Sequence, residues 1–346
     1  MFSLIEYLEK KVFIIAEIGC NFENDLAKAE EMIIKAAEAG ADAVKFQTFI
    51  AEKLASKSAE KFWDIDGCPG ETQLEEFQQV KQLTLEDYKR LSSVAKSAGI
   101  IFFSSPEDEE SADLLECLDM PLFKISSMNI THIPLLKHVA AKKKPIIIST
   151  GASTIGEIEE AIKTIKNAGN KELAILHCIS NYPTKDENAN LRMITHIKTA
   201  FPGVPVGYSD HTYPKNGEGV LAAAVALGAR IIEKHFTFDN TRGGYDHEIS
   251  ADYDGLKSIV TQIRRVENAL GSEIKKPVES ESKARVHARR SLVAADNICE
   301  GTVITREILE VKRPGTGIGP GFLDIVIGRK ARMDISRDTV LQWDMV

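Results

Sequence analysis

The stretch "VPVGYSDHTYPKNGEGVLAAAVALGARIIEKHF" (204–236) decides the fold, because it joins two apolar runs through an Ala-rich segment. The runs "VPVGYSD" (204–210) and "RIIEKHF" (230–236) are short and rich in Val and Ile, which is typical of buried β-strands. The segment 217–229 between them has the composition of an α-helix, and Gly228 stands where a helix C-cap belongs. A strand, a helix and a second strand in this order indicate two parallel strands joined by a crossover.

The same unit recurs from the start of the chain. Six earlier runs have the strand pattern: "FIIAEIG" (13–19), "DAVKFQT" (42–48), "IIFFSS" (100–105), "LFKISS" (122–127), "PIIIST" (145–150) and "LAILHC" (173–178). Amphipathic segments rich in Ala, Glu and Lys separate them, and Gly40, Gly99 and Gly169 mark expected helix C-caps. Near-continuous apolar strands that alternate with helices predict a parallel sheet covered by helices. A total of eight strands favours a closed (β/α)8 TIM barrel over an open doubly wound sheet.

Changes of composition divide the chain into regions. Residues 49–83 interrupt the rhythm after the second strand with aromatics, Gly and Pro, and we expect an insertion folded over one end of the barrel. The barrel domain is predicted to span residues 1–272, and the polar stretch 273–288 is interpreted as a linker or an exposed helix end. Residues 289–346 combine short strands with Gly/Pro turns, which predicts a small, mostly β module of marginal stability on its own.

Bulk composition excludes several classes of function. The chain of 346 residues has a net charge of −8 and no basic stripe, which argues against a nucleic-acid partner. Its five cysteines (Cys20, Cys68, Cys117, Cys178 and Cys299) are scattered and never spaced as CxxC, which favours free thiols in a reducing compartment. Because no apolar stretch reaches membrane-spanning length and no signal-peptide pattern is present, we expect a cytoplasmic protein without membrane contact.

Polar side chains arrive at the carboxyl ends of all eight predicted strands, where barrel enzymes hold their active sites. These ends carry Glu17, Lys45, Gln47, Ser104, Ser105, Lys124, Ser126, Ser127, Ser149, Thr150, His177, Ser180, Tyr182, Ser209, Asp210, His211, Lys234 and His235. Serines and threonines in such places often only cap the next helix, and Ser153 is the strongest case for that reading. A functional site needs groups that act together.

Two pairs of residues meet that requirement. A single strand lysine snorkels to solvent as often as it functions, but Lys45 and Lys124 at equivalent points of two strands favour a shared anion. A lone strand histidine is more often a hydrogen-bonded core group than a ligand. His211 and His235, however, end adjacent strands and can meet at one metal ion. The residues alone therefore predict lysines and helix N-termini that hold a phosphate beside a metal bound by histidine.

The order and spacing of ten motifs resemble those of the sialic acid synthase family over essentially the whole chain. The motifs are "AEIGCN" (16–21), "GADAVKFQT" (40–48), "ETQLEEF" (71–77), "KISS" (124–127), "STG" (149–151), "HCISNYPT" (177–184), "GYSDHT" (207–212), "EKHFT" (233–237), "DHEIS" (246–250) and "KRPGTGI" (312–318). The resemblance implies a metal-dependent condensation of phosphoenolpyruvate with N-acetylmannosamine or a related N-acetylated hexosamine. The implied products are N-acetylneuraminate, a nine-carbon 2-keto acid, and phosphate. It also implies a C-terminal antifreeze-like (SAF) domain swapped across a homodimer.

The resemblance assigns roles by position. His211 and His235 match the ligands of a divalent ion, Mn²⁺ or Mg²⁺, which would make the aldehyde of the open-chain sugar electrophilic. The positions around phosphoenolpyruvate are matched by Lys45, Lys124, Ser105, Ser127, Ser149, Ser180 and Ser209. The contacts to the acceptor sugar are matched by Glu17, Gln47, Tyr182 and Asp246, and Glu17 is also a candidate for proton transfer. Arg313 matches an arginine that reaches the sugar's acetamido group from the partner chain.

Two departures from the family pattern bear on the choice of acceptor. The family's "NHxG" after the first strand is "NFEND" here, with Phe22 in place of the histidine, and its Thr-Pro-Phe is Ser105-Pro106-Glu107. Legionaminic acid, pseudaminic acid and spore-coat polysaccharide synthases share nearly every motif and stay open as alternatives. A Schiff-base aldolase with Lys45 or Lys124 as nucleophile would leave both histidines unused. A carbohydrate- or ice-binding module on an inert barrel would leave the polar strand ends unused.

Overall fold

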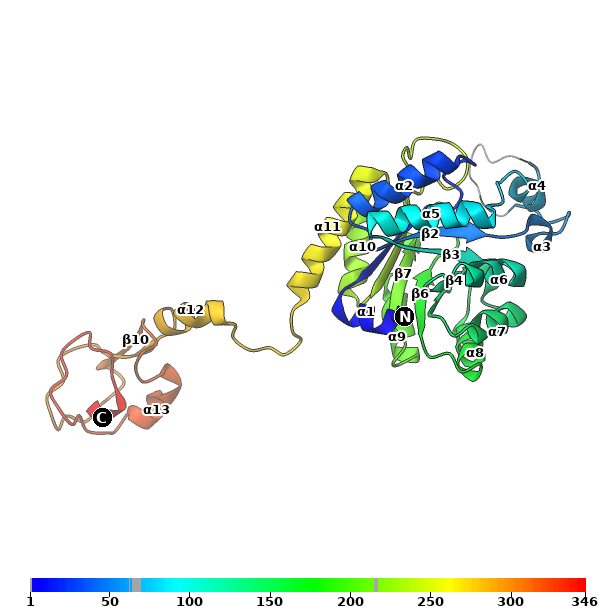
Figure 1. The fold of residues 1–346 in the computed structure, drawn as a ribbon. Coiled ribbons are helices and arrows are strands. Elements are labelled where there is room, and N and C mark those ends of the chain that lie inside the picture. Colours follow the sequence, from blue (N-terminus) through cyan, green and yellow to red (C-terminus); the bar gives the residue numbers. More distant parts are fainter. Residues whose placement is uncertain (1, 62, 64–69, 215–216) are drawn as a thin grey trace. The chain divides into compact units, whose positions relative to one another are not determined.

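The computed structural model of the chain describes residues 2–61, 63, 70–214 and 217–346. They form two compact units, Met1–Gly271 and Ser272–Val346, which are treated separately below. The first unit is a closed parallel barrel surrounded by helices (Figure 1), which confirms the predicted fold class. Among the described residues, no helix combines the length and the apolar character that crossing a bilayer requires.

Eight strands close the barrel in sequence order. They are β1 (Phe13–Glu17), β2 (Ala43–Thr48), β3 (Ile101–Pro106), β4 (Phe123–Ile125), β5 (Ile146–Ser149), β6 (Leu173–Cys178), β7 (Val206–Asp210) and β8 (Ile231–His235). The barrel closes where β1 pairs with β8, with Glu17 opposite His235 in the register. The eight apolar runs of the sequence therefore all became strands, and their carboxyl ends meet at one mouth.

Helices cover the outside of the barrel. They are α2 (Leu26–Glu38), α5 (Leu85–Ala98), α6 (Glu109–Cys117), α7 (Ile133–Ala141), α8 (Ile155–Asn167), α9 (Arg192–Ala200), α10 (Gly217–Ala226) and α11 (Tyr253–Leu270). Local sequence sets their bounds: Thr84 and Thr154 begin α5 and α8 with capping boxes, and Gly99 ends α5 in the left-handed conformation. The expectation that Ser153 caps a helix is wrong, because Thr154 is the N-cap and Ser153 Oγ donates to the Gly151 carbonyl instead.

The barrel has two apolar cores because strand side chains alternate between its faces. Outward residues such as Ile14 pack against the helices in one cluster. Inward residues such as Phe13 and Ile15 fill the interior, where the short helix α1 (Leu4–Lys10) adds Leu4 and Leu8. The lower interior is thus an apolar plug, and the polar side chains of the cavity lie at the carboxyl ends of the strands.

The insertion after β2 forms a wall over the mouth of the barrel, as expected for its described residues. It contains α3 (Ala51–Leu54) and α4 (Gln73–Phe77), and the Phe49 and Phe77 rings pack with their centroids 5.4 Å apart. Together with Leu74 and Val80 they build a small apolar cluster of their own. Residues 62 and 64–69, which include Cys68, lie outside the described residues.

The second unit has a small core of its own. Strands β9 (Ser291–Ala294) and β10 (Leu309–Lys312) form an antiparallel pair, and further isolated bridges join neighbouring turns. Its helical turns are η3 (Glu279–Glu281), α12 (Ser282–His287), η4 (Pro320–Phe322), α13 (Leu323–Val326) and η5 (Trp343–Met345). Leu292, Ile318 and Leu341 are among its buried residues, so this module of short strands and turns encloses apolar side chains.

Candidate active site

A cavity of about 510 Å³ lies at the carboxyl ends of the barrel strands. Among the residues that line it are Glu17, Lys45, Gln47, Ser105, Lys124, Ser127, Ser149, Tyr182, Ser209, His211, His235 and Asp246. The structure therefore brings together the residues to which the resemblance assigns roles, except Ser180 and Arg313. The wall from the insertion adds Phe49, Trp63 and Phe77 to the lining.

The two lysines of the cavity converge on Glu233. Lys45 Nζ lies 3.9 Å and Lys124 Nζ 3.7 Å from Glu233 Oε1, and all three side chains are buried. Ser209 Oγ donates to the same oxygen at 3.0 Å. The ammonium groups hold the pKa of Glu233 below its ordinary value although burial opposes this. An ionised Glu233 therefore keeps both lysines at one place.

Glu17 is the most buried carboxylate of the cavity. Its Oε2 lies 2.7 Å from Lys45 Nζ, and its Oε1 accepts a hydrogen bond from Gln47 Nε2 at 3.0 Å. Burial raises the pKa of Glu17 to about 7, against the opposing effect of Lys45 and with a further increase from Glu233. A carboxyl group that titrates near neutral pH can both accept and donate a proton, which suits the predicted role in proton transfer.

The hydroxyls of Ser127 and Ser180 lie close to the backbone of Gly151, at the turn after β5. Ser127 Oγ accepts a hydrogen bond from the Gly151 amide at 2.9 Å, and a Cβ on Gly151 would come within 2.1 Å of Ser180 Oγ. A side chain at position 151 would therefore clash with the Ser180 hydroxyl and crowd the Ser127 hydroxyl. The hydroxyls of Ser149 and Ser180 are buried without a hydrogen-bond partner among the described residues. Unsatisfied buried donors of this kind are suited to an anionic ligand.

His211 and His235 face each other at the ends of β7 and β8, with ring centroids 5.3 Å apart. His211 Nδ1 lies 2.8 Å from the Ile179 carbonyl oxygen, which leaves Nε2 available. Burial lowers the pKa of His235 well below its ordinary value, so its ring is neutral. The pKa of His211 is raised, because the neighbouring Cys178 Sγ, 3.8 Å away, outweighs the effect of burial.

These imidazoles fit a divalent ion that completes its coordination with ligands from outside the protein. His235 Nδ1 is buried without a hydrogen bond, and the nearest carboxylate oxygen, Asp246 Oδ2, is 3.3 Å away. In the part of the chain that the structure describes, no three or more His, Cys, Asp or Glu side chains are grouped as a metal site. Two imidazoles are fewer than the three protein ligands of a typical catalytic zinc site, so a divalent ion held here would need oxygen ligands from substrate or water.

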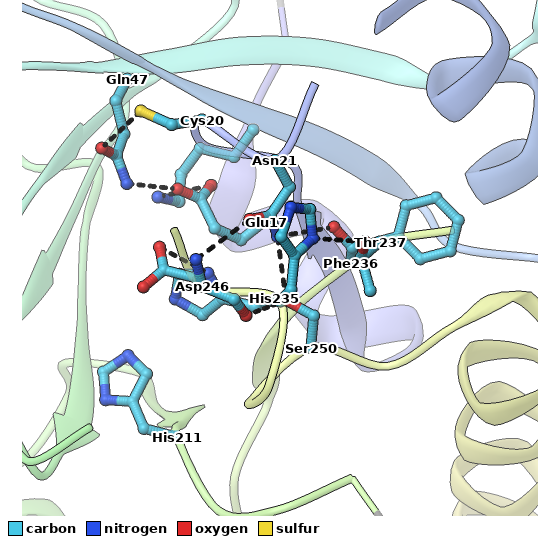
Figure 2. A network of polar contacts seen from close by, with 12 residues as sticks. Glu17, Cys20, Asn21, Gln47, His211, His235, Phe236, Thr237, Asp246 and Ser250 are labelled. Carbon is cyan, nitrogen blue, oxygen red and sulfur yellow. Dashed lines mark hydrogen bonds and ion pairs between the residues drawn. The ribbon is translucent and has the colours of Figure 1, made fainter. Parts of the chain in front are cut away.

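A buried network positions Asp246 beside the histidines (Figure 2). Asn21 Nδ2 donates to the Phe236 carbonyl at 3.0 Å and to Ser250 Oγ at 2.9 Å, and Asn21 Oδ1 accepts from the Asp246 amide at 3.1 Å. The asparagine of "AEIGCN" thus ties the loop after β8 to the end of β1. Burial raises the pKa of Asp246 to about 6.

Other polar residues at the strand ends point away from the cavity. Ser104 Oγ lies 2.7 Å from Thr48 Oγ1, and His177 stacks on Tyr208 with its Nε2 2.8 Å from the Ala189 carbonyl oxygen. Lys234 forms an ion pair with Asp210, and both are fully buried. These groups hold loops and strands in place, which is the structural role weighed for them in the sequence.

The cavity also contains residues to which the sequence assigned no role. Glu233 and Glu107 line the cavity, although neither was named as a site residue. The position of Phe22 gives no support to a role in acceptor choice, because its ring packs in the helix-facing core, 5.9 Å from that of Phe46. Arg313 is an exposed residue of the second unit, directly after β10. Its predicted role across a dimer remains a prediction.

The chain is similar to known protein families and to individual proteins. The NeuB family model matches residues 32–275, and the SAF domain model matches residues 289–346. An N,N'-diacetyllegionaminic acid synthase of Legionella pneumophila is 41% identical over 339 residues, with 96% of this chain and 94% of that protein covered. An uncharacterized protein of Methanocaldococcus jannaschii is 42% identical over 334 residues, with 96% and 94% covered. The crystal structure of N-acetylneuraminic acid (sialic acid) synthetase from Leptospira borgpetersenii in complex with citrate is 34% identical. It has a TM-score of 0.71, and the match covers 79% of this chain and 90% of that chain.

Proposed function

This chain belongs to the NeuB family, and on that premise we propose that it condenses phosphoenolpyruvate with an N-acetylated hexosamine and water. The products would be a nine-carbon 2-keto acid of the sialic acid type and inorganic phosphate. The observation that carries the proposal is the convergence of two buried lysines and several serine hydroxyls in the cavity that also holds the histidine pair.

The lysine side of the cavity suits phosphoenolpyruvate. This donor carries a phosphate and a carboxylate on three carbons, so it needs two cations and several hydrogen-bond donors close together. Lys45 and Lys124 supply the charges. The hydroxyl of Ser149, which lines the cavity and has no hydrogen-bond partner among the described residues, supplies a further donor.

The histidine side suits the acceptor sugar. A divalent ion held by His211 and His235 would supply Lewis-acid polarisation of the open-chain aldehyde. Gln47 and Asp246 can accept or donate hydrogen bonds to sugar hydroxyls, and Tyr182 stacks against His211 with ring centroids 4.1 Å apart. Glu17 lies between the two sides, where it can hold or move a proton at the aldehyde oxygen.

In the proposed reaction, bonds form and break between the substrates and water, and the protein forms no covalent bond with them. C3 of phosphoenolpyruvate bonds to the aldehyde carbon, water adds at C2, and the C2–O bond to phosphate breaks. The chain binds two substrates in reacting distance, and its fixed charges stabilise the developing charges. The apolar wall built by the insertion excludes water from one side of the cavity.

The acceptor can be determined directly. Phosphate release should be measured with N-acetylmannosamine, with a 2,4-diacetamido hexose and with N-acetylglucosamine as a stereochemical control. N-acetylmannosamine is our first candidate. The 41% identity to a synthase whose product carries two acetyl groups supports the diacetamido sugar as the second. Absence of phosphate release with every N-acetylated sugar would contradict the proposed reaction.

A Schiff-base aldolase is the competing enzymatic function, and one observation favours it. Burial and the neighbouring Lys45 lower the pKa of Lys124, which would make its amine more nucleophilic. Borohydride reduction in the presence of pyruvate distinguishes the two functions. A covalent adduct on Lys124 would support the aldolase, whereas phosphate release that a chelator abolishes would support the synthase.

A further inference from the structure

Glu107 is a cavity residue to which the proposed function assigns no role. It directly follows β3, in the "SPED" stretch that departs from the family pattern, and its side chain lines the cavity with Lys45 and Lys124. We propose that the Glu107 carboxyl group protonates the phosphate oxygen as the C2–O bond breaks. This assignment rests on the proposed function and adds a catalytic residue to it.

The side chain is held in a defined orientation. Ser126 Oγ donates to Glu107 Oε2 at 2.8 Å, and Asn129 Nδ2 donates to the same oxygen. Both partners belong to the turn after β4, the strand that carries Lys124. Because both bonds go to Oε2, Oε1 remains for a ligand in the cavity.

Charges around Glu107 suit a proton donor to an anion. The ammonium groups of Lys45 and Lys124 act on it through space, but their ion pairs go to Glu17 and Glu233. Burial raises the pKa of Glu107, and the neighbouring Asp108 raises it further, while Ser126 and the two lysines oppose this increase. A phosphate bound between the lysines would add negative charge and favour the protonated carboxyl group still more.

The proposed step balances. Addition of water gives an intermediate whose C2 carries a hydroxyl, the carboxylate and the phosphate ester. The C2–O bond to phosphate breaks, its electron pair goes to the bridging oxygen, and that oxygen takes the proton of Glu107. The C2 hydroxyl loses its proton to water as the ketone forms, and Glu107 regains a proton from water. No oxidant or further reactant is required.

A purely structural role for Glu107 makes a different prediction. Asp108, and not Glu107, caps α6, so Glu107 is not needed to begin that helix. In Glu107→Gln, the amide oxygen can still accept from Ser126 and Asn129, but the side chain has no acidic proton to give. The substitution therefore separates holding the turn from donating the proton. Glu110→Gln is the matched control, because Glu110 is an exposed acid of α6 that pairs with Lys53.

The test is a single-turnover experiment with full-length protein, the divalent ion, phosphoenolpyruvate and the accepted sugar. Rapid quenching follows loss of phosphoenolpyruvate and appearance of phosphate separately. In Glu107→Gln, phosphate release should slow by at least ~100-fold, whereas consumption of phosphoenolpyruvate should change by less than ~3-fold. In the profile of kcat against pH, the decrease that results from deprotonation of a catalytic acid should also disappear. Glu107→Asp should recover part of the rate, and Glu110→Gln should match the unsubstituted chain.

Each other outcome counts against the assignment. Equal slowing of both events would place Glu107 before elimination, and a higher KM for phosphoenolpyruvate with unchanged kcat would make it a binding residue. Unchanged kinetics would remove it from the site. If Glu107→Gln does not fold, a folded Glu107→Ala chain with the kinetics of the unsubstituted protein would overturn the assignment. An unsubstituted chain that releases no phosphate would overturn the proposed function and the assignment together, so the two failures are distinguishable.

Discussion

Lys234 Nζ lies 2.7 Å from Asp210 Oδ2, and both side chains are completely buried. The pair lies on the helix-facing side of the barrel, and each member immediately precedes one of the two histidines. Tyr208 OH donates to Asp210 Oδ1 at 2.9 Å, and Lys234 also donates to the Thr212 carbonyl. The ion pair thus ties the ends of β7 and β8 together, and with them the spacing of His211 and His235.

Removing one member of this pair should be costly. In Lys234→Met, Asp210 would remain as a buried charge without its cation, and we expect the free energy of unfolding to fall by about 3–5 kcal/mol. Urea denaturation measures the loss, and Lys234→Met/Asp210→Asn should lose less than the single variant. Lys163→Met serves as the control, because its ion pair with Glu159 is exposed and should contribute less than ~1 kcal/mol. A similar loss of unfolding free energy in Lys234→Met and Lys163→Met would contradict a special role for the buried pair.

The histidine pair leads us to expect metal-dependent activity. Chelation should abolish phosphate release, and Mn²⁺ or Mg²⁺ should restore it. His211→Ala or His235→Ala should weaken binding of Mn²⁺ to the protein alone, measured by calorimetry, and should lower the rate by at least ~100-fold. Full activity of a metal-stripped preparation would show that the two rings serve another purpose.

The two lysines should act mainly on phosphoenolpyruvate. Lys45→Met or Lys124→Met removes a buried charge-assisted contact of about 1.5–3 kcal/mol, so the KM for phosphoenolpyruvate should rise roughly 10-fold or more. The KM for the sugar should change far less. Initial rates with each substrate varied in turn provide the measurement. Equal changes in both KM values would indicate that the lysines support the fold or the chemistry.

The pH dependence of donor binding should distinguish the lysines from each other. Burial, with a further contribution from Lys45, lowers the pKa of Lys124 below its ordinary 10.5, whereas the negative charge of Glu17 and Glu233 raises the pKa of Lys45 in spite of burial. An anion prefers the ammonium form, so the affinity for phosphoenolpyruvate is full below the pKa of Lys124 and weakens as the pH rises through it. The profile of KM against pH should show this alkaline loss in the unsubstituted chain but not in Lys124→Met. In Lys45→Met the loss should occur at higher pH, because the charge of Lys45 no longer lowers the pKa of Lys124.

Variants of Arg313 can test whether the protein acts as a homodimer. If Arg313 completes the sugar site of the partner chain, mixing Arg313→Ala chains with His235→Ala chains should regenerate some competent sites by subunit exchange. Two impaired parents would then give an active mixture, measured by phosphate release after exchange. Heterodimers that form but stay inactive would place Arg313 in its own chain's site or in none.

The fold was predictable because each β/α unit has the same local pattern, and the closed barrel follows from having eight of them. The candidate site was predictable as far as residues at strand ends were concerned. Glu233 was not predicted, because a polar residue of "EKHF" taken alone does not indicate which face of the strand it occupies. Side chains alternate along a strand, so Glu233 must share the inner face with His235, while Lys234 faces the helices. That alternation could have found Glu233 and excluded Lys234.

Glu107 was noticed only as a departure from a pattern. Nothing in "SPED" tells whether Glu107 or Asp108 faces the cavity, because both follow the strand where the chain turns into α6. The choice is made by long-range contacts, namely the hydrogen bonds from Ser126 and Asn129 on the next strand's turn. Such contacts between distant segments cannot be predicted from the local sequence.

The apolar plug under the cavity has a consequence for the order in which substrates enter and products leave. Leu4 and Leu8 close the amino-terminal end of the barrel together with inward residues such as Phe13 and Ile231, so nothing passes through that end. The substrate that binds deepest in the cavity must therefore bind first, and the product that lies deepest must leave last. Steady-state kinetics should accordingly show an ordered mechanism. A bulky nine-carbon product waiting at the mouth would then delay the exit of any smaller product beneath it.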